Sequence, residues 1–296
     1  MSCSETNQSL LRFGIPKGSL QQSTIELLDR AGYNISTTNR SYAPDIDDPE
    51  IECVMFRAQE MSRYVEDGVI DLGITGHDWI IENGSDVHEV CELHYSKTTD
   101  QPTRWVLAVP DESQFQKPED LAGGIIATEL VNTTRQYFER LNIPVKKVEF
   151  SWGATEVKAR LVDAIVELTE TGSSIRANKL RVIDTLLTST TRLIVNHESW
   201  SQQQKKNKIE NLALLLKGAI AARSKVGLKM NVPHAQLDRV LKILPSEKSP
   251  TVSQLADEGW VAVEVLLDEK VERDMVPLLH RAGATAIFSY PLNKVV

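Results

Sequence analysis

Short apolar runs of the kind that form β-strands recur along the chain, and segments with apolar residues at three- and four-residue spacing separate them. The helix-like segments include Leu20–Ala31, Ala58–Asp67 and Thr133–Leu141. This alternation predicts α/β layers built on largely parallel sheets. The strand-like runs occupy residues 11–15, 52–56, 71–75, 104–109, 124–128 and 145–150.

A polar stretch at 95–105, which contains Pro102, interrupts this pattern and predicts a crossover between two lobes. A strand expected at 188–196 and a helix expected at 201–223 then return to the first lobe. The predicted domains are a discontinuous first lobe (1–96 and 185–223), a second lobe (97–184) and a third domain (224–296).

The third domain has a different order of predicted elements, in which strand and helix patterns follow one another as βαββαβ. Pro233 suits the start of its first helix and Gly283 the end of its second. This order predicts a ferredoxin-like arrangement. A small unit appended in this way is more often regulatory or oligomerising than catalytic.

Length and composition narrow the classes of function. A chain of 296 residues exceeds the usual span of one hydrophobic core, and its 41% apolar and 25% charged residues are ordinary for a globular protein. The formal net charge of −8 argues against a broad surface for nucleic acid or anionic membrane. An anionic small substrate must therefore meet local cations.

The cysteines and the opening segment exclude other classes. Cys3, Cys53 and Cys91 lie far apart and show no CxxC spacing, so neither a zinc site nor a disulfide framework is predicted. The opening MSCSETNQSL lacks the basic and apolar regions of a secretory signal, and no run approaches the roughly 20 apolar residues of a membrane helix. We therefore expect a cytoplasmic protein.

The segment DAIVELTETGSSI (163–175) carries the strongest candidate chemistry. If its apolar part is a strand that leads into a helix, then Thr171, Gly172, Ser173 and Ser174 place hydroxyl and backbone N–H groups around a phosphate. Glycine allows the backbone to approach the anion closely. Asp163 and Glu167 can accept hydrogen bonds from ribose hydroxyls, so the segment predicts a ribose 5-phosphate site.

The same residues allow a plainer interpretation. Thr171 or Ser173 would then only cap a helix, and both acids would face solvent.

Other loops could converge on this segment. In DLGITG (71–76), Thr75 can donate a hydroxyl hydrogen bond and Gly76 permits close approach of a ligand, although both also fit a simple strand-to-helix turn. Lys17 in IPKGSL and Arg57 after the strand 52–56 could supply charge to phosphate, or could be solvated loop cations. Ligands of open α/β sheets bind at the carboxyl ends of strands, so we expect these loops to meet.

Taken together, the motifs IPKGSL, DLGITG and DAIVELTETGSSIRANKLR resemble the ATP phosphoribosyltransferase family, in this order and over nearly the whole chain. The βαββαβ unit resembles the regulatory domain of the long form of that family. The predicted fold class is α/β, with two periplasmic-binding-protein-like lobes and a carboxy-terminal ferredoxin-like domain.

The resemblance implies a glycosyltransferase (pentosyltransferase) that catalyses the first step of histidine biosynthesis. N1 of ATP would attack the anomeric carbon of phosphoribosyl diphosphate, releasing pyrophosphate and giving N1-(5-phosphoribosyl)-ATP without a protein nucleophile. It also implies Mg²⁺ held mainly by substrate phosphates, feedback inhibition by histidine, and a homo-hexamer built from dimers.

The resemblance also implies site residues, matched position by position. Asp163 and Glu167 would bind the ribose hydroxyls, and Glu170, Thr171, Gly172, Ser173 and Ser174 would wrap the 5′-phosphate. The histidine candidates are Thr251, Ser253 and Ser289. The remaining substrate-binding candidates are Lys17, Arg57, Asp71, Thr75, Gly76 and Glu156.

The chain departs from the family pattern at three places. Ser19 stands where the family commonly has an arginine, which puts one ATP contact in doubt, and Glu60-Met61-Ser62 stands where Asp-Ile-Pro is frequent. Lys179 replaces a frequent glycine, at a cost of about 1 kcal/mol if its backbone is left-handed.

Two competing functions share parts of this pattern. A solute-binding protein also has two α/β lobes around a cleft, but the absent export signal and the third domain argue against it. A phosphoribosyltransferase for a free base would share the phosphate loop, but not DLGITG or the terminal unit.

Overall fold

The computed structural model describes residues 10–37, 42–95, 101–153, 155–245 and 249–296, and the chain divides into two compact units, 1–213 and 214–296. Cys3, most of the opening segment and residues 96–100 of the predicted crossover lie outside the described residues. No helix in the described ranges is both long and apolar enough to cross a membrane.

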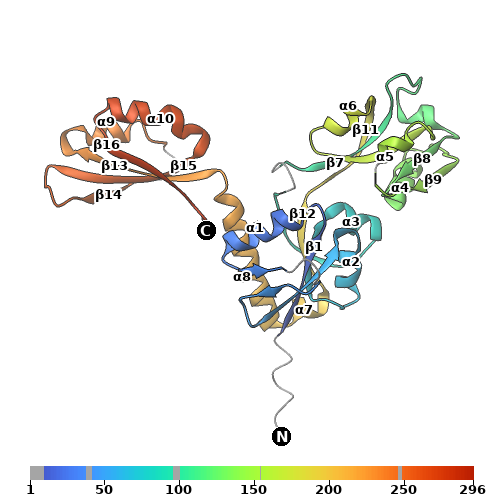
Figure 1. The fold of residues 1–296 in the computed structure, drawn as a ribbon, viewed down its shortest axis with the longest axis horizontal. Helices are drawn as coiled ribbons and strands as arrows, with labels where there is room; N and C mark the ends of the chain where they lie inside the picture. The colour runs from blue at the N-terminus through green and yellow to red at the C-terminus, as the bar shows by residue number, and fades with distance from the viewer. Residues whose placement is uncertain (1–9, 38–41, 96–100, 154, 246–248) are drawn as a thin grey trace, which may run out of the picture. The chain divides into compact units, whose positions relative to one another are not determined.

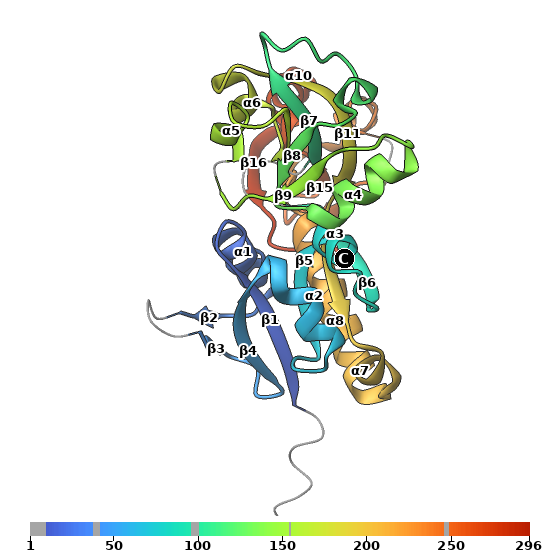
Figure 2. The same ribbon diagram turned by 90° about the vertical axis from the view of Figure 1, so that its right-hand side faces the viewer.

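The first unit contains two five-stranded sheets (Figures 1 and 2). In the first sheet, β1 is parallel to β4 and β5, whereas β12 is antiparallel to β5 and β6. Its strand order is β4 (Ile51–Arg57), β1 (Leu11–Lys17), β5 (Leu72–Gly76), β12 (Thr191–Val195) and β6 (His88–Leu93). The helices of this lobe are α1 (Gln21–Ala31), α2 (Ala58–Glu66), α3 (His77–Asn83) and α7 (His197–Ser201), with a small ribbon of β2 (Ile35–Ser36) and β3 (Asp45–Ile46).

The second sheet is also mixed: β8 is parallel to β9 and β10, whereas β7 is antiparallel to β10 and β11. Its strand order is β11 (Leu180–Ser189), β7 (Thr103–Pro110), β10 (Ala164–Thr169), β8 (Ile125–Thr128) and β9 (Lys147–Phe150). The helices of this second lobe are η1 (Pro118–Leu121), α4 (Val131–Arg140), α5 (Thr155–Lys158) and α6 (Ser173–Ala177).

The two sheets depart from the prediction in one respect. We expected largely parallel sheets, but each contains antiparallel neighbours, because strands that return from the other lobe enter the sheet in the opposite direction. The segment 188–196, expected as a single strand, is divided because the chain passes from the second sheet to the first within it. Ser189 ends β11 opposite Thr103 in the second sheet, and Thr191 begins β12 opposite Gly76 in the first.

The strand β7 illustrates why these residues form the core of the second lobe. The run from Trp105 to Val109 is almost completely buried, as expected for a central strand covered on both faces. Its side chains alternate between two clusters, with Trp105, Leu107 and Val109 in one and Val106 and Ala108 in the other.

A long helix, α8 (Gln203–Ala221), begins in the first unit and ends in the second. Within the first unit, Lys208 forms ion pairs with Asp48 and Glu50, at 2.6 and 2.7 Å. These ion pairs support the predicted return of a helix to the first lobe.

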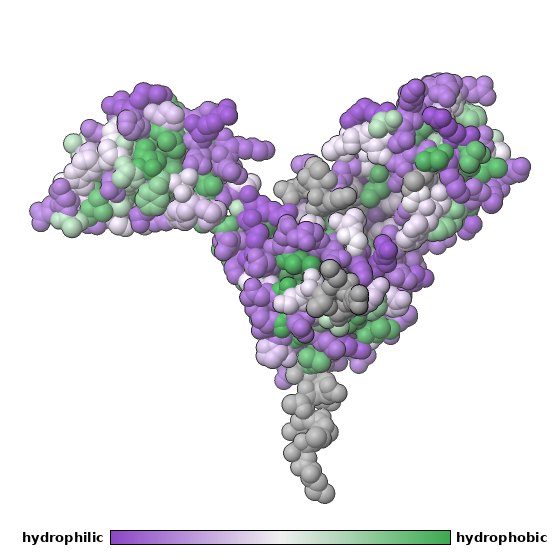
Figure 3. Space-filling view, viewed as in Figure 1, coloured by the Kyte–Doolittle hydropathy of each residue, from purple (hydrophilic) through white to green (hydrophobic). Residues whose placement is uncertain are grey.

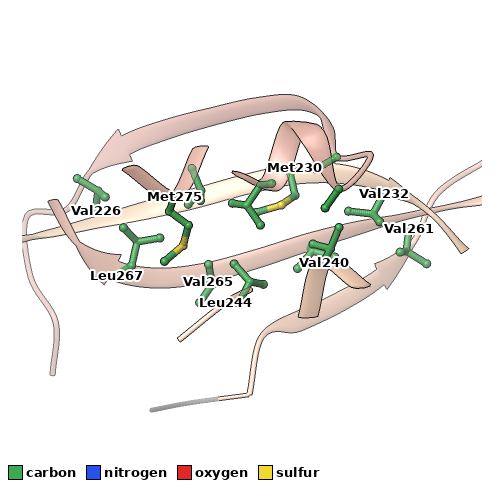
Figure 4. Packing of buried hydrophobic residues seen from close by; sticks show 14 residues of the cluster. Val226, Met230, Val232, Val240, Leu244, Val261, Val265, Leu267 and Met275 are labelled. Atoms are coloured by element: carbon green, nitrogen blue, oxygen red, sulfur yellow. The ribbon is translucent and has the colours of Figure 1, made fainter. Parts of the chain in front are cut away.

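The second unit is a four-stranded antiparallel sheet with helices, as predicted for the βαββαβ order. Its strand order is β14 (Thr251–Gln254), β15 (Trp260–Asp268), β13 (Lys225–Pro233) and β16 (Thr285–Pro291), and its helices are η2 (His234–Gln236), α9 (Leu237–Leu241) and α10 (Glu269–Arg281). Alternate residues of β13 and β15 pack against residues of α9 and α10 (Figure 4). Figure 3 shows mainly hydrophilic residues over the drawn faces, with hydrophobic residues in smaller patches.

Candidate functional site

A cleft of about 330 Å³ opens between the two lobes of the first unit. The first lobe lines it with the carboxyl ends of parallel strands, including Lys17, Arg57 and Gly76, and the second lobe adds Glu167 and Glu170. The structure thus brings together the loops that the sequence predicted to converge, at the edge of the sheet where α/β proteins bind ligands.

The first lobe presents two cations side by side. Lys17 and Arg57 are register partners at the ends of β1 and β4. The Lys17 ammonium also lies 3.5 Å from the centroid of the Tyr42 ring, in a cation–π contact. Gly18 follows Lys17 with a φ of +108°, a backbone conformation that favours glycine, and an ideal Cβ there would make only an ordinary contact with Arg57 Nη1, at 3.4 Å. The pair can attract phosphate.

The segment 71–76 contributes less to the cleft than the sequence suggested. Gly76 lines it, but the Thr75 hydroxyl is buried and donates to the Ala58 carbonyl at 2.7 Å. Asp71 precedes β5 and therefore lies at the opposite end of the strand from Gly76. The structure does not bring Thr75 or Asp71 to the substrate side.

Asp71 instead belongs to a buried network. Its Oδ1 accepts hydrogen bonds from Lys205 at 2.7 Å and Ser199 at 2.6 Å, and its Oδ2 accepts one from the Arg12 backbone at 2.7 Å. Burial alone would raise the pKa of Asp71, but these hydrogen bonds outweigh it and lower the pKa. Asp71 therefore holds the start of α8 against the first lobe.

The predicted phosphate loop follows β10. Gly172 has a φ of +74° and is the N-cap of α6. The Thr171 hydroxyl accepts the N–H of Ser173, the first residue of α6, at 3.4 Å, which is a long capping contact of the kind that the plainer interpretation supposed. An added Cβ at Gly172 would lie 2.8 Å from Arg176 Nη1. The backbone N–H of Gly172 donates a hydrogen bond to Thr169 Oγ1 at 2.8 Å. The side chains of Thr171, Ser173 and Ser174 are exposed, so the loop offers hydroxyls at a turn that glycine favours.

The two acids predicted to bind ribose are separated. Glu167 lies on β10 and lines the cleft, whereas Asp163 precedes the strand, about 13 Å away along an extended chain. Asp163 Oδ2 accepts the Ile125 N–H at 2.7 Å. The structure thus places Glu167, and not Asp163, at the cleft.

Acidic side chains gather around Glu167. Burial, and then the charges of Glu156 and Glu129, raise the pKa of Glu167 to about 7, although the Leu168 N–H donates to Glu167 Oε1 at 2.9 Å. Glu156 lies in α5 and accepts a hydrogen bond from the Ser174 hydroxyl, which joins the predicted acid to the phosphate loop.

Sequence reasoning missed Glu129 and Asp78, although both line the cleft. Glu129 directly follows β8, and its Oε1 accepts the Gly153 N–H at 3.2 Å. The rule that singled out Arg57, a charged residue just after a strand, could also have found Glu129. Asp78 is buried, and only the folded chain shows what it contacts.

The candidate histidine contacts do not come together within one chain. Thr251 and Ser253 lie on β14, and Ser289 lies on β16, at opposite edges of the sheet. Thr251 pairs with Glu264, whereas Ser289 pairs with the core residue Leu228, so the two also lie on opposite faces.

Among the described residues, no group of three or more histidine, cysteine, aspartate or glutamate side chains is arranged to hold a metal ion. Cys53 is buried and Cys91 half-buried, both as free thiols, and burial raises the pKa of Cys53 to about 12. An ordinary packing role accounts for Cys53.

Comparisons with known proteins agree on one family. The model of the ATP phosphoribosyltransferase family matches residues 57–218, and the model of its C-terminal domain matches residues 222–294. The chain is 55% identical to an ATP phosphoribosyltransferase of Chlorobaculum parvum, over 98% of this chain and 99% of that protein. It is 56% identical to that of Solibacter usitatus, over 97% of this chain and 99% of that protein.

A solved structure gives the same result for the two lobes. A chain of the ATP phosphoribosyl transferase complex from Thermotoga maritima matches with a TM-score of 0.60 and 26% identity, covering 70% of this chain and 99% of that chain. A binding protein without catalysis and a transferase for a free base, the two competing functions, are thereby set aside. The chain belongs to the ATP phosphoribosyltransferase family, in the long form with a carboxy-terminal regulatory domain, whose enzymes carry out the first step of histidine biosynthesis.

Proposed function

We propose that the cleft between the two lobes binds phosphoribosyl diphosphate and ATP together and aligns N1 of ATP with the anomeric carbon. The observation that carries this proposal is the division of charge across the cleft. Lys17 and Arg57 line it from the first lobe, and Glu167 and Glu170 line it from the second. Displacement at the anomeric carbon then forms N1-(5-phosphoribosyl)-ATP and releases pyrophosphate.

In this proposal the second lobe holds the phosphoribosyl group. Glu167 accepts hydrogen bonds from the ribose hydroxyls, and the segment from Glu170 to Ser174 surrounds the 5′-phosphate through its hydroxyl and backbone N–H groups. Glu156 orients Ser174. Asp163, Asp71 and Thr75 support the strands and helices around the cleft and are not assigned to the substrates.

The first lobe in turn receives the negative charge of the polyphosphates. Two fixed cations stabilise the charge that develops on the departing pyrophosphate without having to reorganise. No side chain is required as a nucleophile, since the reaction needs mainly that its two substrates be aligned.

Magnesium fits this site as a companion of the substrates. Glu129, Glu156 and Glu167 carry hard oxygen donors, and their charges interact, but they do not form a cluster of metal ligands. Substrate phosphates would supply most of the coordination. Bound Mg²⁺ would neutralise part of the charge on the diphosphate.

We further propose that histidine binds to residues 224–296 and inhibits the reaction, with Thr251 and Ser253 on β14 or Ser289 on β16 among its contacts. The first lobe would comprise residues 1–96 with 185–223, and the second lobe residues 97–184. The end of β11 at Ser189 supports a return to the first lobe near this point of the chain. The working enzyme would be a cytoplasmic homo-hexamer built from dimers.

A two-substrate assay tests the reaction. With Mg²⁺ present, pyrophosphate should form only when ATP and phosphoribosyl diphosphate are both supplied. Pyrophosphate release that does not depend on ATP would overturn the assignment of ATP as the nucleophile.

Repeating the assay with histidine tests the proposed regulation. Histidine should inhibit the full chain, and removal of residues 226–296 should abolish that inhibition. Inhibition that persists after this removal would place the effector site in the lobes.

A further inference from the structure

Helix α3 belongs to the first lobe by sequence, because it connects β5 and β6 of the first sheet. Its side chains nevertheless contact the second lobe. Figures 1 and 2 agree in placing α3 on the side of the first lobe that is nearest to α4. Two buried carboxylates, Asp78 and Glu82, lie four residues apart on it and so share one face of the helix.

Asp78 makes the first of the two contacts. Its Oδ2 accepts the indole N–H of Trp105 at 2.6 Å, and its Oδ1 accepts the Ser189 hydroxyl at 2.9 Å. The Asp78 backbone N–H donates back to Ser189 Oγ at 3.0 Å. Trp105 and Ser189 belong to β7 and β11, so every one of these partners is in the second sheet.

Glu82 makes the second contact, at the start of α4. Its Oε1 accepts the Asn132 N–H at 2.9 Å, and its Oε2 accepts both the N–H and the hydroxyl of Thr133, at 2.9 and 2.8 Å. Leu130, the N-cap of α4, gives no side-chain cap. A carboxylate of the first lobe therefore satisfies the free N–H groups of a second-lobe helix and complements its dipole.

The position of these contacts gives them a mechanical consequence. The chain passes between the lobes before β7 and after β11, and these two passages are adjacent, because Thr103 pairs with Ser189. Two adjacent passages alone would allow the lobes to turn about them. Asp78 contacts the second lobe at this axis, and Glu82 contacts it one helical turn further along, about 6 Å away, so the two contacts together oppose rotation.

We propose that Asp78 and Glu82 are positioning residues for phosphoribosyl transfer, which clamp the two lobes at the angle that brings their substrate groups into line. The inference rests on the proposed function in placing the reaction in the cleft between the lobes. Neither carboxylate needs to contact a substrate. Each acts through the geometry of Lys17 and Arg57 relative to Glu167.

The direct test replaces Glu82 by glutamine in the full chain. Glu82→Gln puts an NH₂ group where one carboxylate oxygen accepted a backbone N–H. A misplacement of about 1 Å between reacting groups can cost about a hundredfold in rate, so kcat should fall between about tenfold and a hundredfold. The KM for phosphoribosyl diphosphate should change less than kcat does, because the second lobe still holds the ribose and 5′-phosphate of that substrate.

Hydrogen exchange, measured by mass spectrometry, tests directly whether Glu82 stabilises the start of α4. Amides at 131–134 should exchange faster in Glu82→Gln than in the parent enzyme. The matched control is Glu66→Gln, because Glu66 Oε1 accepts the Asp86 N–H at 2.9 Å wholly inside the first lobe. This control should leave both kcat and exchange at 131–134 unchanged.

A second variant guards against a folding defect. Thr133→Val changes the second lobe and removes one of the three hydrogen bonds that the Glu82 carboxylate accepts. Like Glu82→Gln it should lower kcat, by about twofold to fivefold. Faster exchange with an unchanged kcat would overturn the positioning role, as would a loss of activity that only follows a loss of folded enzyme. Should the reaction lie outside the cleft, exchange at 131–134 would still increase, but Gly172→Val would leave the donor KM unchanged.

Discussion

The two sides of the cleft carry different chemical groups, and in the proposed function they recognise different parts of a substrate pair. The first lobe offers Lys17 and Arg57, two positively charged residues at the ends of neighbouring strands. The second lobe offers acids around Glu167 and a glycine turn with exposed hydroxyls. The comparison suggests that one side handles the charge of polyphosphates and the other the shape of a ribose phosphate.

Substitution of the loop glycine should have the largest effect on the second lobe, because it should weaken the binding of phosphoribosyl diphosphate. Gly172→Val places a β-branched residue at a φ of +74°, which strains the backbone of the phosphate loop. Its Cβ would also displace the Arg176 guanidinium, which donates to the Thr171 carbonyl at 3.1 Å. The KM for phosphoribosyl diphosphate should rise by about tenfold or more, and the KM for ATP by less. Initial rates with each substrate varied in turn measure the difference, and equal increases would mean that the loop has only a structural role.

Removal of Lys17 or Arg57 should weaken the interaction of the first lobe with the substrate phosphates. Lys17→Ala and Arg57→Ala each delete a charge-assisted contact of about 1.5–3 kcal/mol, equivalent to roughly 10- to 150-fold in kcat/KM. High salt should reduce the difference from the parent enzyme. Lys146→Ala, which removes an exposed lysine of the second lobe, serves as the control and should have little effect. A similar loss in this control would show that net charge, and not position, matters.

The titration of Glu167 sharpens the comparison. Its folded pKa of about 7 lies above its ordinary value of 4.5, chiefly because of burial. The folded state therefore binds this proton more tightly than the unfolded state, and the free energy of unfolding should decrease as pH rises from about 4.5 to about 7. The carboxylate, the better acceptor of ribose hydroxyls, forms as pH passes 7, so the KM for phosphoribosyl diphosphate should fall between pH 6 and pH 8.

Glu167→Gln isolates this proton from those of the substrate phosphates. Both pH dependences should flatten in the variant, as measured by denaturant unfolding and by initial rates. An unchanged slope of donor KM against pH in Glu167→Gln would assign the titration to the substrate or to another group.

The sequence predicted much of this arrangement, because local patterns decide which segments become strands and which loops follow them. IPKGSL, Arg57 and the loop after β10 all lie near strand ends, and strand ends of parallel pairs meet at one edge. Strand direction after a crossover is a tertiary property, so the antiparallel neighbours β12 and β7 were not predicted.

The errors within the motifs have a common physical origin. Asp163 and Glu167 lie in one motif, yet a strand carries them to different ends. Asp71 and Gly76 are separated in the same way. Asp78 and Glu82 escaped notice because their partners, such as Trp105 and Thr133, come from distant parts of the chain.

The smallest expected effect concerns stability alone. Lys179 has a φ of +55°, the left-handed conformation that we expected to cost about 1 kcal/mol. Lys179→Gly should therefore raise the free energy of unfolding by about 0.5–1 kcal/mol, since the gain is partly offset by the greater freedom of glycine in the unfolded chain. Denaturant unfolding measures this change. Because Lys179 lies beyond α6 and does not line the cleft, kcat and both KM values should stay within about twofold. A lower stability would show that the lysine side chain contributes more than its backbone costs, and altered kinetics would extend the phosphate-binding segment past α6.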